Sequence, residues 1–435
     1  MASDNLSAST DLQTSAGATM QRPGNPSGNH GAGTLAIHGG PPTKTKPVGQ
    51  WPAFDDGELD GVVRVLNSQK WWRNEGNEVD QFEQAFAAYH NTQHALGVTN
   101  GTQAIEVALQ ALNIGQGDEV IVPAFTWIST ASAVLMVGAT PILADVDPDT
   151  YCLDPESVAR CVTPRTRAIL PVHMAGQAAD MDGLTEIADQ HGLAIIEDCA
   201  HAHGAEWRGR RVGALHTCGI FSFQMYKLMT AGEGGMIIGN DKKFLEDCFL
   251  YSNCGRIRGD RDYQHVVLGT NARMSELQGA VLRGQLQRLD DQIERRSIQA
   301  NTLDSMLVDV AGLRPQKCDR RATRNPHYMF MFRYDAGQFG NLPRRDFVAQ
   351  LVAEGFPAYV AYPAIHKLPI FDKNEFGPRW ANSADSLPTY RNTNCPVSVD
   401  VGDNVVWLHH RLLLGDDQDL AELLVAIEKI RYHAT

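Results

Sequence analysis

The chain has 435 residues, and its 38 lysines and arginines stand against 51 aspartates and glutamates, so the formal net charge is −13. This acidic balance argues against a nucleic-acid-binding protein, which needs a basic surface. No apolar run reaches the roughly 18 to 20 residues of a membrane span, and residues 1–10 lack the apolar stretch of a secretory signal.

The first 33 residues are rich in Ser, Gly, Asn, Ala and Thr and have almost no large apolar side chains. Such a segment cannot bury enough surface to offset its ordering entropy, so residues 1–33 are predicted to be a disordered tail.

From about residue 51 onward, helical and strand patterns alternate. The predicted helices are 55–66, 78–89, 102–112, 130–137 and 184–191. The predicted strands are 95–99, 119–123, 140–146, 168–172, 194–198, 220–223 and 235–239. This alternation predicts an α/β fold with a mostly parallel sheet, buried on both faces, whose ligands bind beyond the carboxyl ends of the strands.

The pattern changes in the last third of the chain. Apolar residues at helical spacing predict one long helix over 275–308, followed by a strand at 328–334 and helices at 344–354 and 417–431. We therefore expect a large domain over residues 34–300 and a smaller α+β domain over residues 301–435.

Lys227 follows an apolar strand and precedes a turn that contains Gly232, Gly234 and Gly235. Exposure to solvent is the usual fate of a lysine. The glycines, however, allow a backbone to lie close to a ligand, and a partly desolvated lysine has a depressed pKa and attacks aldehydes.

Asp198 ends a predicted strand, and His201 follows it three residues later. The carboxylate could cap a helix or hold the N–H of a pyridinium ring. The imidazole could contact that ring or pack as an ordinary polar residue.

Two further segments also follow strands. Residues 99–103, Thr-Asn-Gly-Thr-Gln, could be a simple helix cap or a cup for a phosphate at a helix N-terminus. Trp127 could pack in the core or stack on a flat cofactor. Each signal is ambiguous alone, but a phosphate cup, an aromatic ring, a carboxylate and a lysine, each after a strand, together predict a pyridoxal phosphate pocket.

The eight cysteines form no Cys-x-x-Cys pair, and their spacing is irregular. We expect free thiols in a reducing cytoplasm and no metal site.

The order of these motifs resembles the DegT/DnrJ/StrS aminotransferases. The segments that carry the resemblance are 99–102, 123–127, 197–201, 221–235 and 269–278. Within the family, segments 200–204, 227–235, 254–256, 327–329 and 407–411 resemble synthases of 3-amino-5-hydroxybenzoate and related aminobenzoates. Segments 149–154 and 332–335 resemble scyllo-inosose aminotransferases.

The resemblance implies a type I aminotransferase fold that binds pyridoxal 5'-phosphate, and a homodimer with both active sites at the interface. It implies that Lys227 holds the cofactor aldehyde as a Schiff base, that Asp198 pairs with the pyridine nitrogen, and that Trp127 stacks on the ring beside His201. The residues that would hold the phosphate are Gly101, Thr102 and Ser222, with Asn271 reaching the cofactor of the neighbouring subunit.

The resemblance also implies transfer of an amino group from glutamate or glutamine to a cyclic six-membered ketone in antibiotic biosynthesis. A dehydroshikimate-type acceptor could lose water and aromatise to an aminobenzoate; the alternative acceptor is scyllo-inosose or a sugar. Tyr226 would line the substrate pocket. Arg256, Arg258, Arg273 and His327 are candidates to bind a substrate carboxylate, although each could instead be structural.

Two rival interpretations come from other classes: a cofactor-binding protein without turnover, and a nucleotide-sugar dehydratase. An intact Lys227 and Asp198 argue against the first. Family dehydratases carry His at the lysine position, so Lys227 argues against the second.

Overall fold

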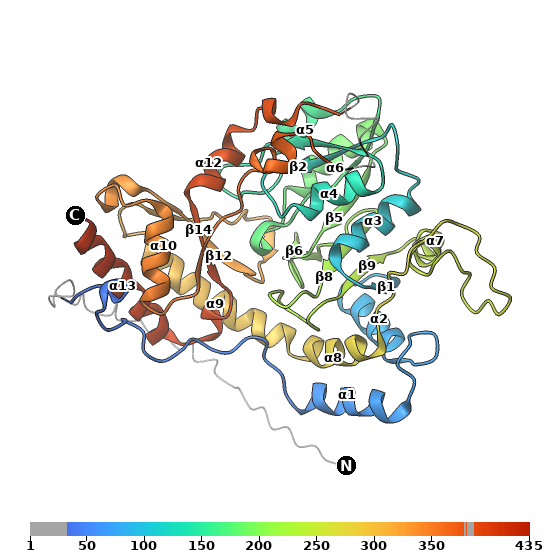
Figure 1. The fold of residues 1–435 in the computed structure, drawn as a ribbon, viewed down its shortest axis with the longest axis horizontal. Helices are drawn as coiled ribbons and strands as arrows, with labels where there is room; N and C mark the ends of the chain where they lie inside the picture. The colour runs from blue at the N-terminus through green and yellow to red at the C-terminus, as the bar shows by residue number, and fades with distance from the viewer. Residues whose placement is uncertain (1–32, 378–379, 381–386) are drawn as a thin grey trace, which may run out of the picture.

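The computed structural model describes residues 33–377, 380 and 387–435 (Figure 1). Apart from Gly33, the predicted tail of residues 1–33 therefore lies outside the described residues. Within the described ranges, none of the helices combines the length and apolar character that a membrane crossing requires.

In the described part of the chain, the larger sheet has seven strands in the order β1-β9-β8-β5-β4-β2-β3. Its strands are β1 (His94–Val98), β2 (Glu119–Pro123), β3 (Thr140–Ala144), β4 (Thr166–Ile169), β5 (Ala194–Asp198), β8 (Cys218–Ser222) and β9 (Gly235–Gly239). Among these strands, β9 runs in the opposite direction to all the others, so its pairs with β1 and β8 are antiparallel and the remaining pairs are parallel. The predicted α/β fold with a mostly parallel sheet is confirmed.

Alternate residues of the strands pack into two separate cores, one on each face of the sheet. The helices on one face are α2 (Glu78–Tyr89), α5 (Pro155–Cys161), α6 (Met181–His191) and α8 (Glu276–Gln287). Those on the other are α3 (Gly101–Ala111), α4 (Ser129–Met136) and α7 (Lys242–Ser252). α1 (Asp56–Ser68) packs against α8 at the lower edge in Figure 1. Burial on both faces explains why these strands are mainly apolar.

The long helix predicted over 275–308 is interrupted. α8 ends at Gln287, and α9 (Leu289–Leu307) begins after Arg288. The Arg288 guanidinium pairs with Glu58 and Asp55, which lie at the start of α1. The prediction of one continuous helix is therefore wrong at Arg288. The sequence pattern missed the break because the helical spacing of apolar residues continues across it.

A smaller sheet of order β10-β12-β14-β13 lies in the C-terminal region, and its strand pairs are antiparallel. Its strands are β10 (Leu313–Pro315), β12 (Met329–Tyr334), β13 (Ala358–Val360) and β14 (Val405–His409). One face packs with α9, α10 (Arg344–Ala353) and α13 (Asp417–Ala434) in a third core. The predicted smaller C-terminal α+β domain is present.

Chain segments cross between the two regions. Leu35 and Val48, near the start of the described chain, pack in the small-domain core. Phe371 and Tyr390 pack against the large sheet. The division at residues 300 and 301 falls inside α9 and stays a prediction.

The remaining elements are short connections. They are β6 (Glu206–Trp207), β7 (Arg210–Arg211) and β11 (Ala322–Arg324), which form a small sheet, with α11 (Pro369–Asp372) and α12 (Pro396–Asn404). The 3-10 turns are η1 (Ala36–His38), η2 (Met174–Gly176), η3 (Ala336–Phe339), η4 (Ile365–Lys367), η7 (Tyr390–Asn392) and η8 (Leu412–Leu414).

Candidate active site

A cavity of about 940 Å³ lies at the carboxyl ends of β2, β5 and β8, between the two domains. Eight of the residues singled out from the sequence line it: Gly101, Thr102, Trp127, Asp198, His201, Ser222, Tyr226 and Lys227. Their convergence follows from the parallel sheet, because strands that run in one direction place their following loops along one edge.

Lys227 lies in the turn after β8, and its Nζ is 4.6 Å from the centroid of the Tyr328 ring. Burial lowers the pKa of this amine to about 8, although the charge of Asp198 opposes the shift. A sizeable fraction of the amine is therefore neutral near physiological pH, which is the form that attacks a carbonyl.

Asp198 ends β5 and is buried. Its carboxylate accepts hydrogen bonds from Thr130 Oγ1 and from the backbone N–H of Ala200, both at 3.1 Å. Burial raises the pKa of Asp198, while the Ala200 N–H and the charge of Lys227 act in the opposite direction. A cationic N–H in the cavity would satisfy this carboxylate, because a buried charge is costly unless it is paired.

The N-terminus of α3 opens onto the cavity. The Asn100 side chain caps the helix by accepting a hydrogen bond from the Gln103 N–H at 2.8 Å. The first N–H groups of a helix have no partner within it and attract anions. A Cβ at Gly101 would stand 2.9 Å from that of Ser222, so the close approach here requires glycine.

His201 and Trp127 present ring systems to the cavity. The His201 ring stacks on Tyr328 with a centroid separation of 4.1 Å, and burial keeps its pKa well below the usual value, so the ring is neutral. Trp127 is 55% exposed, and its ring lies 5.6 Å from that of Tyr362. A flat cofactor therefore has aromatic surfaces available on the cavity walls.

Five sequence candidates do not line this cavity in their own chain: Asn271, Arg256, Arg258, Arg273 and His327. Four of them lie on the chain between α7 and α8, part of which projects from the body of the molecule beside α7 (Figure 1). Arg273 lies near the α8 end of this segment and forms a bridge with Val98 of β1. There Arg256 pairs with Asp260, Arg258 lies over the Phe249 ring, and Arg273 donates to Asn253 Oδ1.

His327 is the fifth of these residues and lies just before β12. Its backbone φ is +52°, in the left-handed region. Burial lowers its pKa to about 4, with a smaller contribution from the charge of Arg296. A neutral imidazole does not supply the positive charge expected of a carboxylate-binding group.

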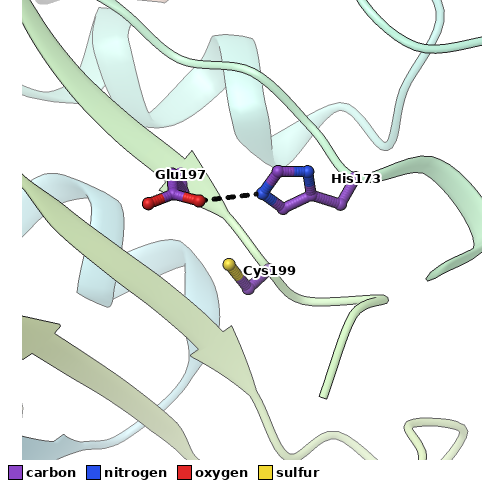
Figure 2. Close-up of side chains that lie close together, drawn as sticks. All are labelled: His173, Glu197 and Cys199. Carbon is purple, nitrogen blue, oxygen red and sulfur yellow. Dashed lines mark hydrogen bonds and ion pairs between the residues drawn. The ribbon is translucent and has the colours of Figure 1, made fainter. Parts of the chain in front are cut away.

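His173, Glu197 and Cys199 lie close together at the end of β5 (Figure 2). Because side chains alternate along a strand, Glu197 points to the face of β5 opposite to Asp198. His173 Nδ1 accepts a hydrogen bond from the backbone N–H of Ala179, so the proton of the neutral ring is on Nε2. Nε2–H donates a hydrogen bond to Glu197 Oε2 at 3.2 Å. No imidazole lone pair remains for a metal ion. The carboxylate also accepts three backbone N–H groups, from Gly213, Leu215 and His216. We interpret this cluster as a structural hydrogen-bond network.

The sequence analysis did not identify the wall of the cavity that the small domain contributes. The residues concerned are Tyr328, Tyr359, Tyr362, Trp407 and His409. Strand alternation in residues 405–409 could have placed Trp407 and His409 on one face. It could not have shown that this face is turned toward Lys227.

The chain is similar in sequence to proteins of one aminotransferase family. A profile of the DegT/DnrJ/EryC1/StrS aminotransferase family matches residues 53–421. The chain is 47% identical over 374 residues to 3-amino-5-hydroxybenzoate synthase of Amycolatopsis mediterranei strain S699, covering 85% of this chain and 94% of that protein. It is 38% identical over 417 residues to L-glutamine:2-deoxy-scyllo-inosose aminotransferase of Streptomyces paromomycinus, covering 92% and 98%.

Solved structures show the same relationship. The crystal structure of a 3-amino-5-hydroxybenzoic acid synthase matches with a TM-score of 0.81 at 45% identity, covering 88% of this chain and 99% of that chain. The aminotransferase fold expected from the sequence motifs is thereby confirmed.

Proposed function

The chain belongs to the DegT/DnrJ/EryC1/StrS aminotransferase family, and from this premise we propose that it uses pyridoxal 5'-phosphate to transfer an amino group from glutamate or glutamine to a cyclic six-membered ketone. The observation that carries the proposal is the placement of the Lys227 amine and the Asp198 carboxylate in one cavity with the open N-terminus of α3.

The cavity fits the cofactor group by group. The buried Asp198 carboxylate suits the N–H of the pyridine ring. Gly101, Thr102 and Ser222 suit the phosphate, since the helix N-terminus favours an anion. Trp127 and His201 offer ring systems in the cavity wall that could contact the pyridine ring of the cofactor. Lys227 suits the aldehyde, because its lowered pKa leaves a nucleophilic amine.

The protein's own residues then move protons and hold charge. When bound, pyridoxal phosphate supplies a ring that withdraws electrons from the reacting carbon. Asp198 keeps the ring nitrogen protonated by accepting its N–H. Lys227 Nζ removes a proton from the α-carbon of the amino donor and returns a proton in the second half of the cycle.

We propose a dehydroshikimate-type acceptor, in secondary-metabolite biosynthesis, because 3-amino-5-hydroxybenzoate synthase is among the relatives and shares 47% identity. With such an acceptor, Lys227 Nζ would remove ring protons so that two molecules of water leave the aminated ring, which thereby becomes aromatic. The product would be an aminobenzoate.

A second candidate acceptor is a scyllo-inosose, as named for other relatives. Among the described residues that line the cavity, Lys227 is the only lysine or arginine. An acceptor without a carboxylate needs no guanidinium clamp, so this feature of the single chain favours a cyclitol ketone.

We further propose a homodimer in which the chain between α7 and α8 completes the neighbouring site. Three apolar side chains within six residues of this segment are exposed: Tyr263 (74%), Val266 (52%) and Leu268 (94%). Exposed apolar side chains that gather in one place are typical of an interaction surface. In the dimer, Asn271 would reach the partner's phosphate, and Arg256, Arg258 or Arg273 would reach its substrate. We place the enzyme in the cytoplasm, since all eight cysteines are free thiols.

The test is an assay of the purified protein with glutamine or glutamate and either 3-dehydroshikimate or scyllo-inosose, with products identified by mass and by aromatic absorbance. Lys227→Ala should lower turnover by at least about 10²-fold, the lower range for a lost general acid–base group, and borohydride should no longer attach the cofactor to the chain. The exposed Lys243→Ala is the matched control. Unchanged turnover in Lys227→Ala would refute the proposal.

A further inference from the structure

The small-domain wall of the cavity is organised by the alternation of β14. Val406 and Leu408 point into the small-domain core. Trp407 and His409 point the other way and line the cavity. His409 is the last residue of β14 and pairs with Met329 of β12. It is therefore held on a regular strand rather than on a mobile loop, which suits a residue that must meet a ligand at a defined position.

The hydrogen bonding of His409 determines its tautomer. The backbone N–H of Arg411 donates to His409 Nδ1 at 3.1 Å. Because Nδ1 is the acceptor, the proton of the neutral ring is on Nε2. Burial lowers the pKa of His409 to about 3, with smaller contributions from the charges of Arg411 and Arg296. The ring is thus a neutral donor at any pH at which the enzyme would work.

Two tyrosine rings lie near His409. The Tyr226 ring centroid lies 5.7 Å from that of His409, and the Tyr359 centroid lies 6.5 Å away. Both tyrosines line the cavity. This side of the cavity offers N–H and O–H groups on apolar rings, and a polyoxygenated ring has matching oxygen atoms.

Building on the proposed function, we propose that His409 donates its Nε2–H to an oxygen substituent on the six-membered ring of the acceptor. The residue thereby determines specificity for an oxygenated ring. A hydroxyl group or a carboxylate oxygen would serve equally as the partner, so the assignment holds for either candidate acceptor. A site with a fixed donor rejects analogues that lack the matching oxygen, because the donor would remain unpaired.

The test compares three substitutions in the cofactor-loaded enzyme. His409→Phe keeps a ring and removes the donor. His409→Gln restores an N–H near the position of Nε2. His433→Phe, at an exposed histidine on α13, is the matched control. Binding of 3-amino-5-hydroxybenzoate and of scyllo-inositol is measured by calorimetry, and the acceptor KM and kcat are measured beside it.

His409→Phe should weaken binding of a probe that wild type binds, and raise the acceptor KM, by about 10- to 100-fold, as expected for a lost hydrogen bond at a buried site. His409→Gln should recover most of the loss, and kcat should change less than KM. If His409→Phe does not fold, His409→Met provides the same comparison. Wild-type binding and KM in these apolar variants would overturn the inference.

The amino-donor half of the reaction separates this inference from the proposed function. Addition of glutamine or glutamate alone should change the visible absorbance of the bound cofactor equally in wild type and in the His433→Phe control. If wild type shows no such change, the proposed function fails, while the binding of the two probes still decides the role of His409.

Discussion

At the scale of single residues, two side chains of opposite charge, Lys227 and Asp198, are buried in the cavity. Burial lowers the pKa of Lys227 and raises that of Asp198, and the attraction between the two groups only partly offsets these shifts. Each residue therefore lacks a full partner from the chain itself. A cofactor with an aldehyde at one end and a protonated ring nitrogen at the other would supply a partner to each residue: the aldehyde to Lys227 and the ring nitrogen to Asp198.

The shifted pKa of Lys227 leads to a pH-dependent prediction for the cofactor-free protein. Only the neutral amine reacts with an acylating reagent, so labelling of Lys227 should increase as pH rises through about 8. An ordinary lysine side chain has a pKa of about 10.4, so its labelling would reach half of the maximum near that pH. The measurement is the extent of labelling of the Lys227 peptide by mass spectrometry over a pH series.

Asp198→Asn is the control for that series. Its carboxylate raises the pKa of Lys227, so removing the charge should move the labelling midpoint to lower pH. A wild-type midpoint above pH 10 would show that the amine is not desolvated.

At the scale of elements, the end of β5 carries functional and structural carboxylates on opposite faces. Side chains alternate along a strand, so Asp198 points to the cavity while Glu197 points to the hydrogen-bond network on the opposite face. That network ties the chain between β7 and β8 and the segment around His173 to β5 (Figure 2). The position of Asp198 thus depends on contacts from several parts of the sequence.

Glu197→Ala should destabilise the protein strongly. It removes the common acceptor of three backbone N–H groups and of His173, and each buried donor left unpaired costs about 1–3 kcal/mol. We expect the free energy of unfolding, measured by urea titration, to fall by roughly 3 kcal/mol or more.

The same change at Glu246 provides a comparison. Glu246 forms an exposed pair with Lys242 on α7 at 3.7 Å, and such pairs contribute about 0.3–0.5 kcal/mol. Equal losses for Glu197→Ala and Glu246→Ala would contradict the importance assigned to the network.

At the scale of the whole molecule, the cavity of the single chain contains no arginine among its described lining residues. The cavity has a lysine, a carboxylate and aromatic walls, whereas the candidate arginines lie between α7 and α8 and do not line it. A second copy of the chain would bring that segment to the neighbouring cavity. Assembly would then be a requirement for substrate binding rather than a separate property.

Leu268→Asp should weaken the proposed dimer. Leu268 is 94% exposed in the single chain, and a charge at this position would have to be desolvated in an apolar interface. We expect a larger monomer fraction by sedimentation velocity and reduced turnover at low protein concentration. Val308→Asp, at a 69% exposed valine after α9, should leave the association unchanged. A wild-type protein that is monomeric at all concentrations would contradict the proposal.

The main strands along the chain, and the residues that follow them, could be predicted from the sequence alone. β2, β5 and β9 have the bounds predicted from their apolar runs, since a strand buried on both faces is mainly apolar along its length. Lys227, Asp198 and Gly101 could be placed in one cavity because parallel strands end at one edge. Local pattern and a topological rule were sufficient for these features.

The features that depend on distant partners are visible only in the folded molecule. The antiparallel direction of β9, the break at Arg288 and the aromatic wall around His409 are set by contacts between segments far apart in the chain. The same holds for the arginines, whose residue type suits a carboxylate but whose location excludes them from the cavity of their own chain. Periodicity reports which face of an element is apolar, whereas packing determines what that face meets.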